Sequence, residues 1–135
     1  MKPLYYILSW TWGILLNIAG AIVFLVLICA GYKPHRHAGS LYIEIGEHWG
    51  GFEMGMFFLC QKGASTHTKD HEFGHSLQNC LFGPLFPFLV TIPSAMRYHY
   101  RNWCTKHGKE LKTKYDDIWF EGQASKWGKF HREKW

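Results

Sequence analysis

The chain has 135 residues, which leaves room for one small domain. Its net charge of +5 is unevenly distributed: residues 1–96 carry five basic and five acidic side chains, whereas residues 97–135 carry ten basic and five acidic ones. Aromatic residues make up 18% of the chain and apolar residues occur in blocks, which argues against a compact soluble globule and indicates a protein that meets a membrane.

An uncharged apolar stretch runs from Leu4 to Ala30. As a helix it would exceed the roughly 20 residues needed to cross a bilayer, and aromatic residues gather at its ends as they do at membrane interfaces. A cleaved signal peptide is the alternative, but its apolar region is usually shorter, about 7–15 residues. We therefore predict a transmembrane anchor over residues 1–32, followed by the functional part, residues 33–135.

Basic residues and histidines follow the anchor at positions 33–37, where they favour the cytoplasmic side of a membrane. Apolar and polar residues then alternate over 41–45, and a second apolar stretch covers 52–59 after several glycines. This pattern predicts a β-hairpin with a long loop. The edge of this hairpin could receive an extended substrate as an added strand. Alternatively, the hairpin is a scaffold that only covers a helix.

The motif His71-Glu72-Phe73-Gly74-His75 comes next. Residues four apart share one face of a helix, so the two histidines can offer imidazole nitrogens to one Zn²⁺, while the glutamate can accept a proton from bound water. A chance match is the alternative, because the chain contains nine histidines. We predict a helix capped within residues 65–68 and ended by Gly83-Pro84. The site needs a third ligand, and Leu81 stands where metzincins have a histidine.

Residues 85–96 are apolar but contain two prolines and are too few for a comfortable crossing. A third ligand beyond them must lie on the same side of the membrane as the two histidines. We therefore predict that residues 83–97 form a re-entrant or interfacial element.

Cations and aromatic side chains alternate between Arg97 and Trp103, which suits the lipid headgroup layer. Nucleic-acid-binding proteins also use such stretches, but the apolar segment at the start of the chain makes lipid the expected partner, with no nucleic acid. Tyr98, His99 and Tyr100 are candidates for the donor that stabilises the oxyanion when water attacks a carbonyl.

The last helix is predicted to begin near Asp116-Asp117, because carboxylates favour a helix N-terminus. In it, Trp119-Phe120-Glu121-Gly122-Gln123-Ala124 resembles the W-x-x-E-G-x-A or E-G-x-A segment that supplies the third zinc ligand in many gluzincins, a class of zinc metallopeptidases; the aromatic residue sits one position closer here. The resemblance implies that Glu121 is the third ligand, and that Gly122 and Ala124 allow close helix packing. Such families often carry an acid one turn after the ligand, where this chain has Ser125.

These features predict an α+β membrane protein: a transmembrane helix, a β-hairpin, a zinc helix, a re-entrant or interfacial segment, and a last helix with the third ligand. With the resemblance, they imply a membrane-anchored zinc metallopeptidase that acts on a peptide or membrane-protein substrate near the bilayer surface. The alternatives are a non-catalytic, zinc-stabilised membrane protein and a small membrane-interaction protein with a chance motif.

The basic residues place the catalytic part in the cytoplasm. The four cysteines form no C-x-x-C pair and indicate no disulfide framework. The sequence does not indicate an oligomeric state.

Overall fold

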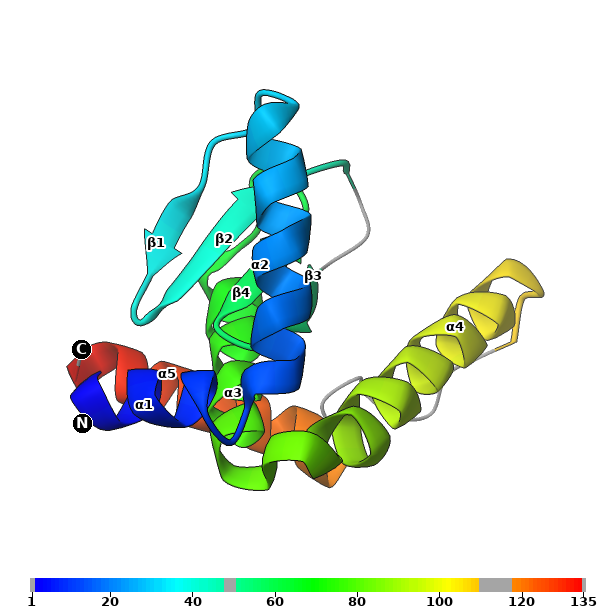
Figure 1. Cartoon of the computed structure of the whole chain (residues 1–135). Coiled ribbons are helices and arrows are strands. Elements are labelled where there is room, and N and C mark those ends of the chain that lie inside the picture. Colours follow the sequence, from blue (N-terminus) through cyan, green and yellow to red (C-terminus); the bar gives the residue numbers. More distant parts are fainter. Residues whose placement is uncertain (1, 48–50, 110–117, 135) are drawn as a thin grey trace.

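The structure is a computed structural model that describes residues 2–47, 51–109 and 118–134. Its elements in chain order are α1 (Lys2–Trp10), α2 (Ile14–Cys29), β1 (His35–His37), β2 (Ser40–Glu44), β3 (Gly51–Met54), β4 (Phe57–Cys60), α3 (Thr66–Phe82), the 3₁₀ turn η1 (Gly83–Leu85), the π-helical turn η2 (Pro87–Thr91), α4 (Ile92–Lys106) and α5 (Trp119–Lys134). The fold is α+β, as predicted (Figure 1).

The four strands form one sheet in the order β1-β2-β4-β3, and the predicted two-stranded hairpin is wrong. Gly55, with a φ of +70°, lets residues 52–59 fold back on themselves as β3 and β4. β4 lies between β3 and β2 and pairs with β2 in parallel, with Leu41 opposite Phe57. The basic residues after the apolar stretch form β1, which pairs with β2 in antiparallel fashion.

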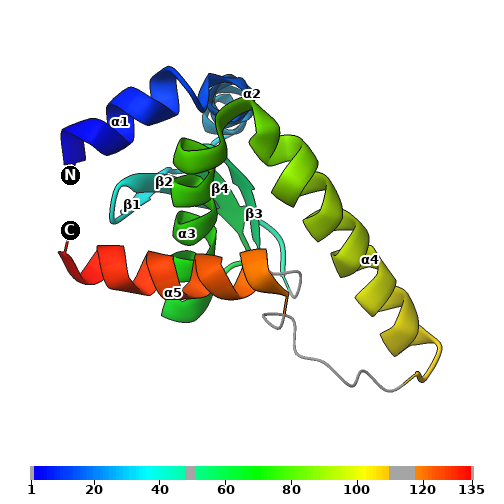
Figure 2. The same ribbon diagram turned by 90° about the horizontal axis from the view of Figure 1, so that it is seen from below.

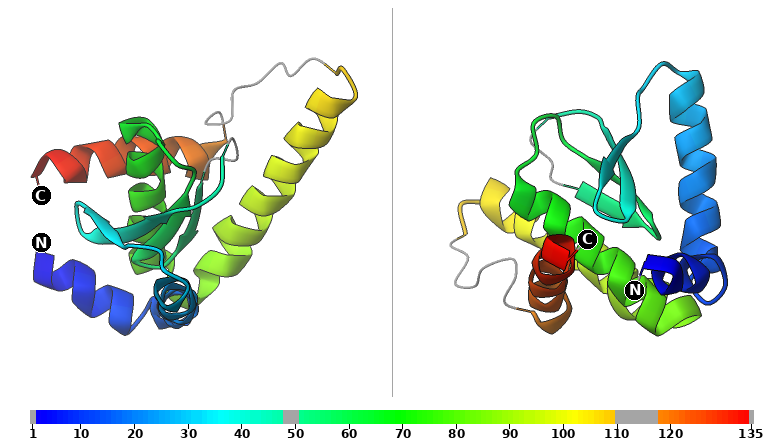
Figure 3. Two further views of the ribbon diagram at one scale, coloured as in Figure 1. Left: turned by 90° about the horizontal axis from the view of Figure 1, so that it is seen from above. Right: turned by 90° about the vertical axis from the view of Figure 1, so that its left-hand side faces the viewer.

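The sheet lies between α2 and α3, and α5 crosses α3 on the side away from the sheet (Figure 3). On one face the ring of Phe24 in α2 packs on Phe57 of β4, with centroids 4.9 Å apart. On the other face His37 of β1 bonds to Asp70 of α3 at 2.7 Å. Residues of α2, the sheet and α3 therefore share one hydrophobic core.

The predicted continuous helix from Leu4 to Ala30 is wrong, because α1 and α2 meet at an angle of 90°. Contacts with the end of α3 hold this bend. The side-chain amide of Asn79 donates to the carbonyl of Gly13 at 3.1 Å, and the indole N–H of Trp12 donates to a backbone carbonyl of α3. A Cβ at Gly13 would lie 2.4 Å from Asn79 Nδ2, so a larger residue there would displace the Asn79 side chain from this contact.

Among the described residues, no single helix is both long and apolar enough to cross a bilayer. The bent pair α1–α2 passes the test of length and composition only when its two parts are taken together, as does a pair formed by α3 and the helix after it. The expected crossing over residues 1–32 therefore stays a prediction.

The helix predicted to carry His71 and His75 forms as α3: Ser65 caps it by accepting from Thr68 N–H at 3.2 Å, and it ends where Gly83 takes a φ of +57°. Residues 85–96 then form η2 and the beginning of α4, which runs away from the sheet (Figures 1 and 2). The prolines lie in first turns, where a missing N–H breaks no helical hydrogen bond. The predicted start of the last helix at Asp116-Asp117 lies outside the described residues.

α3 and α5 cross at backbone contact (Figure 2). A Cβ at Gly74 would lie 1.7 Å from the carbonyl oxygen of Ala124, and a Cβ at Gly128 would lie 1.7 Å from that of Asp70. Ala124 packs at the crossing, as the resemblance implied, and is fully buried. The glycines that make the contact possible are Gly74 and Gly128, whereas Gly122 is partly exposed.

We expect Gly74→Ala to lower the free energy of unfolding by about 3 kcal/mol or more, because a backbone oxygen cannot move aside as a side chain does. Chemical denaturation measures this loss. Gly63→Ala is the control, since Gly63 has a φ of +70° but open space around its Cβ position, so that only backbone strain of about 1–2 kcal/mol is added. Equal losses in the two variants would contradict the tight crossing.

Candidate metal centre

Three buried side chains from α3 and α5 converge on one point. The Nε2 atoms of His71 and His75 are 3.1 Å apart, and each lies 3.2 Å from a different carboxylate oxygen of Glu121. Glu121 is fully buried, and the two histidines are less than a tenth exposed. The three residues therefore form a group that could hold a metal ion, and the predicted ligand positions come together in space.

The geometry of this group fits a tetrahedral ion. Two nitrogen ligands at about 2.0–2.1 Å from Zn²⁺ stand about 3.3 Å apart, close to the observed separations. Glu121 Oε2 is buried and faces His71 Nε2 at 3.2 Å, so both atoms can turn a lone pair toward a cation placed between them. Two imidazoles and one carboxylate are a donor set that zinc accepts.

Gln78 fixes the tautomer of His75, and the sequence analysis missed this residue. Its amide nitrogen donates to the carbonyl of Phe120 at 2.8 Å and to Oε1 of Gln123 at 2.9 Å, which turns its own oxygen toward His75. That oxygen lies 2.8 Å from His75 Nδ1 and can only accept. Nδ1 therefore carries the hydrogen, and Nε2 presents its lone pair to the metal position. The spacing of Gln78, three residues after His75 on the same helix face, was the available signal.

Ser125 occupies the position where the resemblance led us to expect an acid. Its Oγ lies 2.8 Å from His71 Nδ1, so the hydroxyl orients the first histidine as Gln78 orients the second. Glu121 is held in turn by Ser94 of η2–α4, whose hydroxyl donates to Oε1 at 3.0 Å. Each of the three ligands thus has a hydrogen-bonding partner outside the ligand set.

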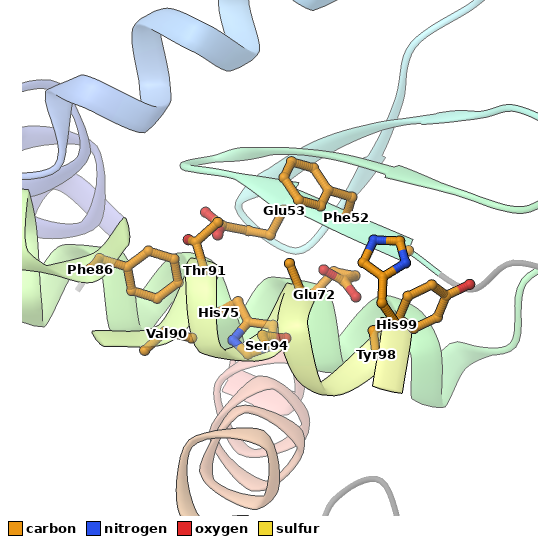
Figure 4. A pocket seen from close by; sticks show the side chains of 12 residues that line it. Phe52, Glu53, Glu72, His75, Phe86, Val90, Thr91, Ser94, Tyr98 and His99 are labelled. Atoms are coloured by element: carbon orange, nitrogen blue, oxygen red, sulfur yellow. The ribbon is translucent and has the colours of Figure 1, made fainter. Parts of the chain in front are cut away.

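A pocket of about 190 Å³ opens beside His75, between β3 and α4 (Figure 4). Glu72 and His75 line it, and so do Tyr98 and His99, two of the three oxyanion candidates. Tyr100 is 62% exposed and stacks on Trp103 instead, which excludes it from the pocket wall.

Burial dominates the electrostatics of the pocket. It raises the pKa of Glu72, because desolvation outweighs the attraction of the two histidines, and it raises the pKa of Glu53 on β3 well above the ordinary range. Burial opposes the charged form of His75, but the hydrogen bond that its ring donates to Glu121 and the nearby carboxylates raise its pKa to about 9. The pKa of Glu121 is lowered, since hydrogen bonds from both histidines overcome desolvation.

This arrangement has the parts needed for metal-assisted hydrolysis: a ligand set, a carboxyl group that is not a ligand, and a partly apolar pocket that gives access to both. Comparisons of the chain with protein-family models, with curated proteins and with solved structures give no match.

We expect Ser125→Ala to weaken zinc binding about 10–100-fold, because the imidazole of His71 loses the hydroxyl that orients it. Competition with a chromophoric chelator measures the dissociation constant. Ser76→Ala is the matched control, since the Ser76 hydroxyl bonds to Tyr5 and to a backbone carbonyl and touches no ligand. Equal zinc affinity in the two variants would show that Ser125 has no part in the site.

Proposed function

We propose that this protein is a membrane-associated zinc metallopeptidase that hydrolyses peptide bonds. The observation that supports this most is the buried group of His71, His75 and Glu121 next to a pocket that also contains the Glu72 carboxyl. The donor set favours zinc over magnesium or calcium, which prefer oxygen ligands. Zinc held there would supply a Lewis acid that polarises a carbonyl and acidifies water.

Glu72 is the general base of the proposed reaction. Its carboxyl follows the first ligand on α3 and is not part of the ligand group. The raised pKa makes the Glu72 carboxyl a stronger proton acceptor than an ordinary carboxyl, which suits a residue that accepts a proton from the attacking water and then passes it to the leaving amine. Tyr98 and His99, across the pocket, are the proposed donors to the oxyanion.

β3 is the proposed docking edge for the substrate. It is the last strand of the sheet, and Gly51 and Phe52 at its start line the pocket. A Cβ at Gly51 would lie 2.9 Å from the Glu72 carboxyl oxygen, so the strand backbone runs directly beside the proposed base. A peptide added to this edge would pass its backbone along the pocket.

A zinc ion that only joins α3 and α5 is the competing function, and the tight crossing of these helices favours it. Glu72 separates the two functions. A structural site does not need the Glu72 carboxyl, whereas a hydrolase requires it.

We expect Glu72→Gln to keep one zinc per chain and to reduce peptide hydrolysis at least about 1,000-fold, because an amide cannot accept the proton. Zinc content and cleavage of a mixed peptide library are measured on the same preparations. Glu133→Gln, an exposed carboxyl on α5, is the control for the loss of one negative charge. Zinc binding without any cleavage by the native chain would favour the joining function.

The proposed membrane contact is the outer side of α1 and α2. Large apolar side chains are exposed there: Leu4, Ile7, Trp10, Ile14, Leu15, Ile18, Ile22, Leu25, Val26 and Ile28. α2 is about 24 Å long and packs Phe24 on the sheet, so we propose that its outer face enters the bilayer beside the sheet. The basic last third of the chain suits the anionic cytoplasmic surface.

We expect the double variant Ile22→Glu, Leu25→Glu to move the protein from the membrane fraction to the soluble fraction, because both side chains are more than half exposed on α2 and would carry charge into lipid. Cell fractionation measures the distribution, and zinc content shows that the fold is kept. Lys129→Glu on exposed α5 is the control for the added charge. Unchanged membrane retention would contradict this contact surface.

A further inference from the structure

Two of the residues that line the pocket, Glu53 and Thr91, each have a buried side-chain oxygen with no hydrogen-bond partner among the described residues: Glu53 Oε1 and Thr91 Oγ1. In Figure 4, these side chains lie with Phe86 toward one end of the pocket, and Tyr98 and His99 lie toward the other. Glu53 is only 5% exposed. None of the reaction steps proposed above uses either atom.

The position of Glu53 follows from the β3–β4 turn. The backbone N–H of Gly55 donates to the Glu53 carboxyl, which anchors the side chain and accounts for part of its hydrogen-bonding capacity. The remaining oxygen is buried without a donor, and a buried acceptor left unpaired is costly. A donor carried by a molecule bound in the pocket would pair this oxygen.

We propose that Glu53 and Thr91 bind a primary ammonium group of the substrate at this end of the pocket. This inference deepens the proposed peptidase and depends on it for the identity of the substrate. An ammonium group has three donors and a positive charge, so it can donate to both oxygens and stabilise the charged form of the Glu53 carboxyl, which burial disfavours. Neutral donors would satisfy the hydrogen bonds but not the charge.

The rest of the pocket limits what can carry the ammonium group. Its volume is about 190 Å³, and a cavity of about 150 Å³ holds a benzene molecule, so there is space for about one amino-acid side chain. Phe52, Phe86 and Val90 supply apolar walls. The first residue of a peptide, with its free α-amino group and an apolar side chain, meets both requirements. The ε-amino group of a lysine is the second source of the same chemistry.

Calorimetric titration of the full-length Glu72→Gln chain in detergent tests the proposal without turnover, with and without zinc. The probes are leucinamide, which carries an α-ammonium group, N-acetyl-leucinamide, which carries none, and N-acetyl-lysinamide, which carries only the ε-ammonium group. We expect leucinamide to bind and the acetylated leucine probe to bind at least about 10-fold more weakly. Binding of the lysine probe alone would assign the site to a side-chain ammonium group and would also support the proposal.

Adding Glu53→Gln should weaken binding of the ammonium probe at least about 10-fold, and adding Thr91→Val should weaken it by a smaller factor. Glu47→Gln, an exposed carboxyl shortly before β3, should leave it unchanged. The proposal is overturned if leucinamide and its acetylated form both bind with the same affinity, if neither ammonium probe binds, or if binding is unaffected by both pocket variants.

Failure of this inference can be told apart from failure of the peptidase. Glu53-dependent binding of leucinamide by a chain that takes up no zinc or cleaves no peptide would keep the ammonium site and remove the hydrolase. Cleavage by the native chain that is equally fast for free and N-acetylated peptides, with no Glu53-dependent binding, would keep the hydrolase and remove the ammonium site.

Discussion

The close crossing of α3 and α5 is the contact on which the metal centre depends. Gly74 and Gly128 each leave space for a backbone oxygen of the facing helix, at positions where a Cβ would lie 1.7 Å from it. Only at this separation does the short side chain of Glu121 reach both imidazoles on α3. The glycines lower helix propensity, and burial of the crossing offsets that loss. The motif therefore encodes helix packing as well as ligands.

A set of polar contacts then holds the ligands at this crossing. Gln78 and Ser125 orient the two histidines, and Ser94 binds the glutamate from a third helix. Buried polar groups are expensive unless they are paired, so this set stabilises the fold only when nearly every member has its partner. Glu53 and Thr91 differ from this set, because each has a buried oxygen without a partner among the described residues and both residues line the adjoining pocket.

The first thirty residues, which are strongly apolar, also make buried polar contacts with the sheet and with α3. Asn17 is fully buried and accepts from the Met56 N–H at 2.7 Å, which holds the β3–β4 turn beside the pocket. Tyr5 bonds to Ser76 on α3, and Ser9 lies 3.3 Å from Cys80 on the same helix. The inner side of this segment is thus part of the domain that forms the metal centre, while its outer side is apolar and exposed.

The sequence by itself determined the features that depend on local spacing: the α+β class, the zinc helix with its cap and its end, and the shared face of His71 and His75. The resemblance supplied Glu121, whose reach to α3 no local pattern could establish. Tertiary contacts decided the rest. The bend after Trp10, the parallel pairing of β4 with β2, and the roles of Gln78 and Glu53 all arise between segments far apart in the chain. Period and composition report only on neighbours along a helix or strand, so they could not predict such contacts.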